Sequence, residues 1–221
     1  MMNKFKNNKF GKKWLNVASG FYTLDDFINI DNSVFLKLLP LYPLIKYFLT
    51  EGRKKWFENY LKAKNSNHVL IRANCRKDLP FEDNSIDHIL CSHFLEHIYY
   101  EEAEKVLHGF YRILKPNGTL HLIVPDLNSR IEKYANSDSD NRANEFIDSL
   151  IFNYKSRPSF LVNFLEFTGN FGLFHRWMYN QDSFEGLVKQ IGFTILDKNE
   201  SQTATWRADN NHNQINIIVK K

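Results

Sequence analysis

The sequence predicts an α/β domain whose mostly parallel sheet is covered by helices on both faces. Short apolar runs alternate with longer segments of helical periodicity along most of the chain. The 221 residues are 43% hydrophobic and 24% charged, and this ordinary globular composition excludes disordered, collagen-like and coiled-coil chains. Neither an internal repeat nor a low-complexity linker divides the sequence. We therefore expect a single domain spanning residues 1–221.

The strands of this sheet are predicted from short apolar or alternating runs that end at turn residues. These runs are residues 13–17, 27–30, 69–73, 86–91, 119–124, 193–196 and 215–219. The connection between the first two strands, residues 18–26, is too short for a full crossover helix. The last two runs are expected to form a terminal pair of strands.

The helices are predicted from apolar periodicity and from residues that begin or end helices. Residues 33–64 are apolar and interrupted by prolines, which predicts two or three short helices after the second strand. Residues 101–114 form an amphipathic helix that stops at the turn Lys115-Pro116-Asn117-Gly118. Asp182 with Glu185 suggests a capping box for the last helix, which Gly192 ends. Residues 136–144 are polar and are expected to form a surface loop.

Several classes of function and location are disfavoured by composition. The net charge of +4 is weighted toward the chain ends, which does not indicate a nucleic-acid partner. Two cysteines cannot build a disulfide framework, so a cytoplasmic setting is expected, and no signal peptide is evident. Residues 34–49 contain Lys37 and Lys46 and are too short to span a membrane. A buried helix pair is the simplest interpretation of that segment, while a lid or a peripheral membrane contact stays open.

Two segments resemble the class I S-adenosylmethionine-dependent methyltransferases. Residues 78–97, DLPFEDNSIDHILCSHFLEH, and residues 112–126, RILKPNGTLHLIVPD, are similar to the pattern of small bacterial type-11-like members. Weaker similarity is found at residues 15–31, LNVASG to FINID, and at residues 175–193. The resemblance implies a Rossmann-like three-layer sandwich with an antiparallel terminal strand and a helical insertion at residues 127–180. It also implies S-adenosylmethionine as the cofactor.

The resemblance implies methyl transfer to an oxygen or nitrogen of a small acceptor. A sugar or nucleotide-sugar of surface-polysaccharide biosynthesis is the expected acceptor. In parallel sheets ligands bind beyond the carboxyl ends of the strands. The residues expected to contact the cofactor there are Asn16, Ala18, Ser19, Gly20, Asp31, Asn74, Cys75, Ser92 and His93.

Three of these positions bear most directly on cofactor binding. A carboxylate at the end of the second strand, Asp31, can accept hydrogen bonds from both ribose hydroxyls. Ala18 stands where the family usually has glycine, and alanine disfavours a positive φ. Asn74 stands where the family commonly has aspartate near the adenine amine. These two departures keep open the alternative of a catalytically inactive binding or scaffold protein.

Candidate residues for the chemistry follow from the need to remove a proton from the acceptor. His93 is the first choice as general base because histidine titrates in the useful range, followed by His175 and Asp126. For His93 a helix-capping or core role is the alternative. Trp177 and Tyr179 are candidates for an aromatic acceptor pocket, since sugar rings present apolar faces, and core packing is their alternative.

A competing motif overlaps these residues. His93-Phe94-Leu95-Glu96-His97 matches the H-x-x-E-H zinc signature, in which two histidines share one face of a helix. That signature requires a helix through the motif and a third ligand downstream, whereas here a buried strand ends just before His93. We therefore expect no metal site, and a zinc hydrolase remains a remote alternative.

Overall fold

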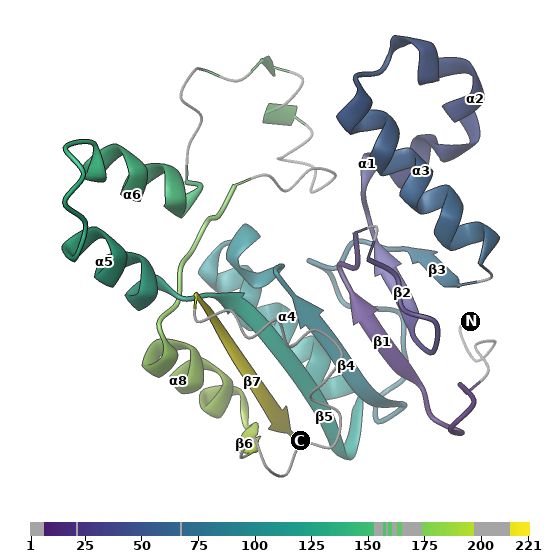
Figure 1. Cartoon of the computed structure of the whole chain (residues 1–221). Helices are drawn as coiled ribbons and strands as arrows, with labels where there is room; N and C mark the ends of the chain where they lie inside the picture. Colours follow the sequence, from purple (N-terminus) through teal and green to yellow (C-terminus); the bar gives the residue numbers. More distant parts are fainter. Residues whose placement is uncertain are drawn as a thin grey trace.

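Seven strands form a single sheet in the order β3-β2-β1-β4-β5-β7-β6 (Figure 1). The computed structural model describes residues 7–20, 22–66, 68–152, 157, 159–160, 163–164, 174–196 and 213–221. The strands are β1 (Trp14–Val17), β2 (Ile28–Asp31), β3 (Val69–Arg72), β4 (Ile86–Ser92), β5 (Leu114–Pro125), β6 (Thr194–Leu196) and β7 (Gln214–Lys220). The first five strands pair with one another in parallel, and β7 is antiparallel to both β5 and β6. The predicted α/β class and antiparallel terminal strand are confirmed.

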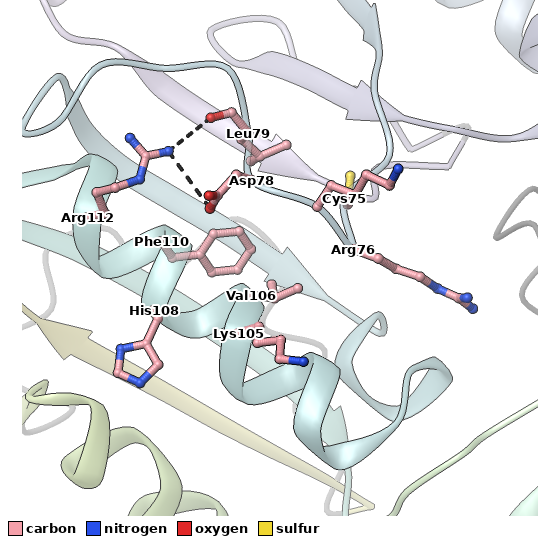
Figure 2. A pocket seen from close by; sticks show the side chains of 11 residues that line it. Cys75, Arg76, Asp78, Leu79, Lys105, Val106, His108, Phe110 and Arg112 are labelled. Carbon is pink, nitrogen blue, oxygen red and sulfur yellow. Dashed lines mark hydrogen bonds and ion pairs between the residues drawn. The ribbon is translucent and has the colours of Figure 1, made fainter.

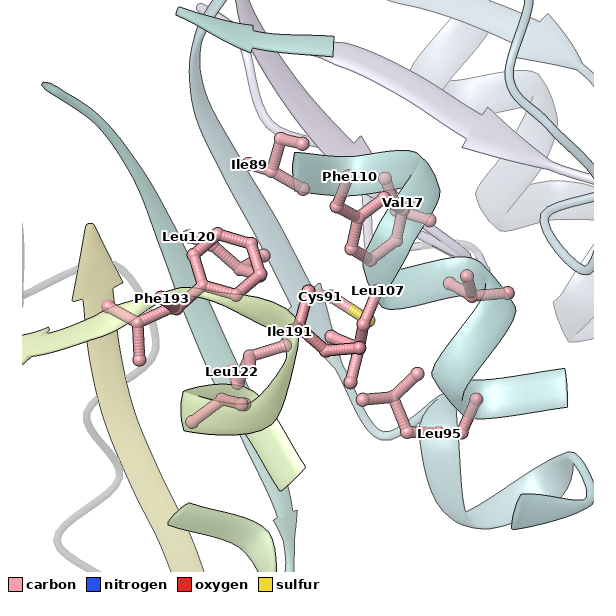
Figure 3. Packing of buried hydrophobic residues seen from close by; sticks show 14 of the residues in the cluster. Val17, Ile89, Cys91, Leu95, Leu107, Phe110, Leu120, Leu122, Ile191 and Phe193 are labelled. Carbon is pink, nitrogen blue, oxygen red and sulfur yellow. The ribbon is translucent and has the colours of Figure 1, made fainter. Parts of the chain in front are cut away.

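One face of the sheet is covered by α4 (Tyr100–Ile113) and α8 (Gln181–Ile191), which also contact each other (Figure 1). Their apolar stripes meet the inward-facing residues of the central strands in one large core (Figure 3). Leu107 and Phe110 of α4 are fully buried there, as are Leu120 and Leu122 of β5. Burial of side chains of this size stabilises the fold by roughly 1.5–3 kcal/mol each.

The opposite face carries the alternate residues of the same strands. Trp14, Phe27, Leu90 and Ile123 form a smaller buried cluster there. Successive residues of a strand point to opposite sides of the sheet, so neighbouring residues of one strand belong to the two different clusters. This alternation explains why Leu90 of β4 and Ile123 of β5 are buried on this side, whereas their neighbours in sequence belong to the larger core.

The end of α4 differs from the prediction. The residues expected to form a turn, Lys115 to Gly118, belong to β5, which begins directly after the helix. The pairing of β4 with β5 is irregular here, because Ile86 pairs with Leu114 whereas His88 pairs with Thr119. Asn117 adopts φ 65°. The turn chemistry is therefore used to make a bulge inside a strand rather than a loop between elements.

The start of α8 also differs from the prediction. Asn180, not Asp182, is its N-cap, and its side chain accepts a hydrogen bond from the Ser183 backbone amide. Ser183 returns a bond to the Asn180 amide, so the reciprocal pair is Asn180 with Ser183 rather than Asp182 with Glu185. The predicted end of α8 is confirmed, since Gly192 follows the helix in the left-handed conformation.

The segment after β2 forms a helical layer above the carboxyl ends of β2 and β3 (Figure 1). Its elements are α1 (Val34–Leu38), η1 (Leu39–Leu41), α2 (Tyr42–Ile45), η2 (Lys46–Phe48) and α3 (Glu51–Asn65). Leu39 and Tyr42 pack on Phe57 and Tyr60 of α3, as a buried helix pair would. Leu44, Tyr47 and Phe48 point outward, and Phe48 is 89% exposed. None of the described helices is long and apolar enough to cross a bilayer.

Beyond β5 the chain forms α5 (Leu127–Ala135) and α6 (Arg142–Leu150), which contact each other. The polar segment predicted as a loop, 136–144, is thus shorter than expected, because its last residues begin α6. Both helices fall within the predicted insertion at 127–180. The extent of that insertion stays a prediction, because part of it lies outside the described residues.

Candidate functional site

The turn that follows β1 contains two residues with a positive φ and leaves its backbone accessible. Ala18 adopts φ 50° and Gly20 adopts φ 53°, while the Ser19 amide donates to the Ile30 carbonyl over 3.0 Å. A Cβ atom built on Gly20 would meet no other atom within 4 Å. Ala18 adopts the left-handed conformation that alanine disfavours, at a cost of about 1–2 kcal/mol, so the missing glycine strains this turn but does not prevent it. The turn therefore leaves room for a ligand to approach the backbone.

Asp31 closes β2 next to this turn. Its Oδ2 accepts from the Gly20 amide over 2.9 Å, and its Oδ1 accepts from the Ser33 amide over 2.6 Å. The Tyr60 hydroxyl of α3 also donates to Oδ1, over 3.1 Å. Burial raises the pKa of the Asp31 carboxyl, while the hydrogen bonds from Ser33, Gly20 and Tyr60 oppose that rise. Asp31 is thus held in place by three donors.

The fit of a nucleoside to this carboxylate can be judged from its acceptor capacity. A carboxylate offers about four lone-pair positions, and three protein donors already use Asp31. One position is left for a ribose hydroxyl, and a second becomes available if the Tyr60 hydroxyl turns away. The turn and the carboxylate therefore fit a ribose at the end of β2, with Tyr60 as a competitor that the sequence did not reveal.

The side chain of Asn16 does not lie at this edge. It is buried within β1, where its amide donates to the Tyr22 carbonyl and to Asn29 Oδ1 over 2.8 and 2.9 Å. Asn29 in turn bonds the backbone of Leu24. The expected cofactor contact is replaced by a structural role, because this pair of amides fixes the short connection between β1 and β2.

The residues after β3 are divided between the surface and the core. Asn74 Oδ1 accepts from the Arg76 amide over 3.0 Å, which leaves one lone pair of that oxygen for a ligand. The Cys75 side chain belongs to the hydrophobic core, and burial raises the pKa of its thiol to about 12. Asn74 therefore keeps its predicted role as a candidate, while the Cys75 side chain is almost fully buried.

Ser92 and His93 end β4 at the same edge. The Ser92 side chain is buried, and His93 adopts φ 52°, a strained conformation for a residue other than glycine. His93 Nδ1 lies 3.1 Å from Glu96 Oε1, and its Nε2 lies 3.2 Å from Gln214 Oε1 of β7. With its side chain 48% exposed, His93 is anchored on one side and faces solvent on the other.

The residues of the H-x-x-E-H motif do not share a helix. Only the three-residue turn η3 (Leu95–His97) follows His93, so the arrangement that a zincin requires is not formed. His97 instead meets His175, their ring centroids 5.0 Å apart, next to the buried carboxylate of Glu96. Burial lowers the pKa of His175 to about 4, although the Glu96 charge opposes that shift. The structure thus pairs His97 with a histidine far along the chain.

The remaining candidates take different positions. Asp126 caps α5, with its carboxylate accepting from the Asn128 and Ser129 amides over 3.1 and 3.3 Å. Trp177 is 45% exposed and lies against Tyr100, with ring centroids 5.3 Å apart. Tyr179 is fully buried and packs on Phe184, so the prediction that it lines an acceptor pocket is wrong and the core-packing alternative holds.

A separate pocket of about 480 Å³ lies between α4 and the chain after β3 (Figure 2). Its charged lining is mostly basic and includes Arg76, Lys77 and Lys105. Arg112 closes one end by donating to the Leu79 carbonyl over 3.2 Å. Except for Cys75, none of the predicted site residues contributes to it. It is therefore distinct from the strand-end edge that carries Asp31 and His93.

Both the sequence and the structure are similar to those of known proteins, methyltransferases among them. Residues 44–122 match the family model for a methyltransferase domain, a segment that leaves out the turn at Ala18 and the carboxylate of Asp31. No curated protein matches the sequence. The structure is similar to that of the PH0226 protein of Pyrococcus horikoshii OT3, with 18% identity, a TM-score of 0.52, and coverage of 99% of this chain and 84% of that one. It is also similar to a SAM-dependent methyltransferase of Archaeoglobus fulgidus, with 13% identity, a TM-score of 0.49, and coverage of 95% and 86%.

Proposed function

We propose that this chain is a class I S-adenosylmethionine-dependent methyltransferase and that it transfers the methyl group to an oxygen or nitrogen atom of a small acceptor; the match of residues 44–122 to a methyltransferase domain supports the first part. When bound, the cofactor supplies a methyl group on a positively charged sulfonium. The main task of the protein is then to hold the acceptor atom close to that methyl group and in line with the bond that breaks. The residues for this task must lie at the edge formed by the carboxyl ends of the parallel strands.

One observation supports the cofactor site most strongly. Asp31 lies beside the open turn at Ala18 and Gly20, and its Oδ2 accepts directly from the Gly20 amide over 2.9 Å. The carboxylate and the turn are therefore one unit, in which a nucleoside can approach the backbone while its ribose binds the acid. Asn74 lies after the neighbouring strand, β3, where it is available to an adenine amine.

The scaffold alternative depended on the loss of a glycine at Ala18. Because Ala18 adopts the left-handed conformation, the substitution does not close the turn. We therefore retain catalysis as the proposal, and the binding experiment below decides between the two.

We propose a carbohydrate as the acceptor because of Trp177. Its indole is a half-exposed aromatic surface near the carboxyl end of β4, where the Glu96 carbonyl accepts from the Trp177 amide over 3.3 Å. Sugar rings pack their apolar faces on such side chains. Tyr100 supports the indole from the side, which keeps the ring oriented.

His93 is our proposal for the general base. It is the most exposed of the three candidates, and its Nδ1 is oriented by Glu96 Oε1. Asp126 is occupied as a helix cap, and His175 is buried behind η3. A base that accepts the acceptor proton must be reachable from the ligand side. His93 Nε2 lies 3.2 Å from Gln214 Oε1 and becomes available to the acceptor when the Gln214 side chain turns away.

Cofactor binding is tested by calorimetric titration with S-adenosylhomocysteine, which cannot react, and with S-adenosylmethionine. We expect Asp31→Ala to weaken binding by about 1–3 kcal/mol, which is roughly 5- to 150-fold. Asp182→Ala removes an exposed carboxylate of α8 and is the matched control. Circular dichroism confirms that each variant is folded. Failure of the unsubstituted chain to bind either ligand would refute the proposal and favour a scaffold.

The acceptor is tested by release of S-adenosylhomocysteine in the presence of free sugars and nucleotide-sugars. Trp177→Ala should raise the KM for the acceptor at least tenfold with little change in cofactor affinity. Trp56→Ala, which removes a partly exposed indole packed on Phe35, is the control and should leave that KM unchanged. Turnover with amine acceptors only would contradict the carbohydrate part of the proposal.

A further inference from the structure

We propose that Glu96, His97 and His175 bind a divalent transition-metal ion, with zinc the best match. One ligand atom from each of these residues lies within 4.8 Å of the other two. His175 is brought to the cluster by its neighbour, because the Arg176 amide donates to the Glu96 carbonyl over 2.6 Å. The site is thus assembled from η3 and from a segment near α8 that is remote in sequence.

The contacts of the two histidines indicate which ring nitrogens are open to the cluster. His97 Nδ1 lies 3.1 Å from the Phe174 carbonyl, and a carbonyl can only accept, so Nδ1 carries the hydrogen. The buried Nδ1 of His175 has no hydrogen-bond partner within the described part of the chain. Consequently His97 Nε2 presents a lone pair, and His175 Nδ1 is a buried ring nitrogen that is open to a ligand. Histidines that bind metals show the pattern of His97, with the second nitrogen held by a backbone carbonyl or carboxylate.

The carboxylate between them is buried and incompletely bonded. Glu96 is 1% exposed, and within the residues that the structure describes its Oε2 has no hydrogen-bond partner. His97 Nε2 lies 3.9 Å from the other oxygen, Oε1. Three potential ligand atoms therefore face one another, and two of them, Glu96 Oε2 and His175 Nδ1, have no hydrogen-bond partner among the described residues. Burial of such groups is costly unless a cation or a proton joins them.

Neighbouring polar groups do not supply that link. The Arg130 guanidinium is close enough to interact with Glu96 and His175, but among the described residues its buried Nε has no hydrogen-bond partner. The buried hydroxyl of Tyr179 is likewise unpartnered within the described chain. His93 Nδ1 bonds Oε1 and not Oε2. Several buried polar atoms without partners around one point indicate that a bound ion or water satisfies them.

The donor set determines the kind of ion. Two imidazoles and one carboxylate suit zinc and related transition metals better than calcium or magnesium, which prefer oxygen. Two ligands at about 2.0–2.2 Å from one ion are at most roughly 4.4 Å apart, so small side-chain rotations close the site. A zinc ion with three protein ligands keeps one position open for an oxygen atom.

The location connects the ion to the reaction. Glu96 follows β4 at the edge that carries Ser92 and His93, and Trp177 lies two residues after His175. An ion here would bind an acceptor oxygen and lower the pKa of its hydroxyl. This role rests on the proposed methyl transfer, whereas metal binding itself does not.

The test uses the full chain, stripped of metal with a chelator and titrated with Zn²⁺ and Co²⁺ in the absence of cofactor. We expect one ion per chain, a rise in the thermal unfolding temperature, and visible Co²⁺ absorption typical of a four- or five-coordinate site. Glu96→Gln and His175→Ala should each weaken Zn²⁺ binding at least 100-fold. His108→Ala, which removes an exposed histidine of α4, is the matched control and should bind as the unsubstituted chain does.

Several outcomes would overturn the proposal. The first is no stoichiometric binding by the folded unsubstituted chain; the second is binding that survives both ligand substitutions. Binding that His93→Ala abolishes but His175→Ala does not would assign the ion to the H-x-x-E-H pair instead. If His175→Ala does not fold, Glu96→Gln keeps the test available because the amide preserves the shape of the side chain. Zinc binding without cofactor binding would refute only the proposed function.

Discussion

The Tyr60 hydroxyl donates to Asp31 Oδ1 over 3.1 Å and so links α3 to the carboxyl end of β2. Both side chains are buried, and Tyr60 is among the largest fully buried residues of the chain. The helical layer above β2 therefore contributes directly to the proposed ribose site. It also competes with the ribose, because it uses one lone pair of the carboxylate.

Tyr60→Phe should consequently have opposite effects on stability and on affinity. Loss of a hydrogen bond to a carboxylate should lower the free energy of unfolding by about 1.5–3 kcal/mol. The freed lone pair should tighten S-adenosylhomocysteine binding roughly fivefold, as expected for one hydrogen bond of about 1 kcal/mol. Denaturant unfolding and calorimetry measure the two quantities. Tyr42→Phe removes the matching hydroxyl, which bonds Glu58 over 3.0 Å, and should leave affinity unchanged; weaker binding by Tyr60→Phe would contradict the competition.

Ala18→Gly should be tolerated or stabilising by up to about 1 kcal/mol. The substitution relieves the left-handed strain at φ 50°, which offsets the greater conformational entropy of glycine in the unfolded chain. Ala103→Gly is the same chemical change in the interior of α4, where the methyl group is fully buried, and should cost about 1 kcal/mol or more. Denaturant midpoints of the two variants measure the contrast. Equal destabilisation would mean that Ala18 is not strained.

Acid should destabilise the fold through His88. Burial lowers its pKa to about 3, whereas the unfolded chain has an ordinary value near 6.5. Below pH 6.5 the unfolded state binds a proton that the folded state does not, so stability is present above that pH and is lost as the pH falls toward 3. The slope approaches about 1.4 kcal/mol per pH unit for this group.

Unfolding by denaturant between pH 4.5 and 7.5 measures this slope. His88→Gln should flatten it, whereas the exposed His108→Gln should not. His121, whose pKa burial also lowers, contributes to what remains. An unchanged slope in His88→Gln would show that other groups control acid sensitivity.

Asn16→Ala should separate structure from cofactor binding. Its amide donates to the Tyr22 carbonyl and to Asn29 Oδ1, so truncation should cost about 1–3 kcal/mol of stability because two hydrogen bonds are lost. Affinity for S-adenosylhomocysteine, measured well below the unfolding temperature, should change less than twofold. A large loss of affinity at unchanged stability would restore Asn16 as a cofactor contact.

Local pattern predicted most of the elements because periodicity and turn residues act within a few positions. The central strands, the amphipathic α4 and the end of α8 at Gly192 follow from it, and so does the placement of Asp31 and His93 at strand ends. The prediction from local pattern was wrong at Lys115 to Gly118, which was expected to be a turn but belongs to β5. There the pairing of β4 with β5 outweighed a local turn preference.

The sequence by itself determined the fold class and the edge of the sheet where we propose that a ligand binds, because both follow from the order of strands and helices along the chain. Only the tertiary structure decided which side chains meet there. The pairing of Tyr60 with Asp31, and of His97 with His175, depends on how separate elements pack. The same holds for Trp177 and Tyr179, which are two residues apart yet differ in burial. Tyr179 forms a bridge with Asp126 beside β5, and that contact across the chain directs its ring into the core.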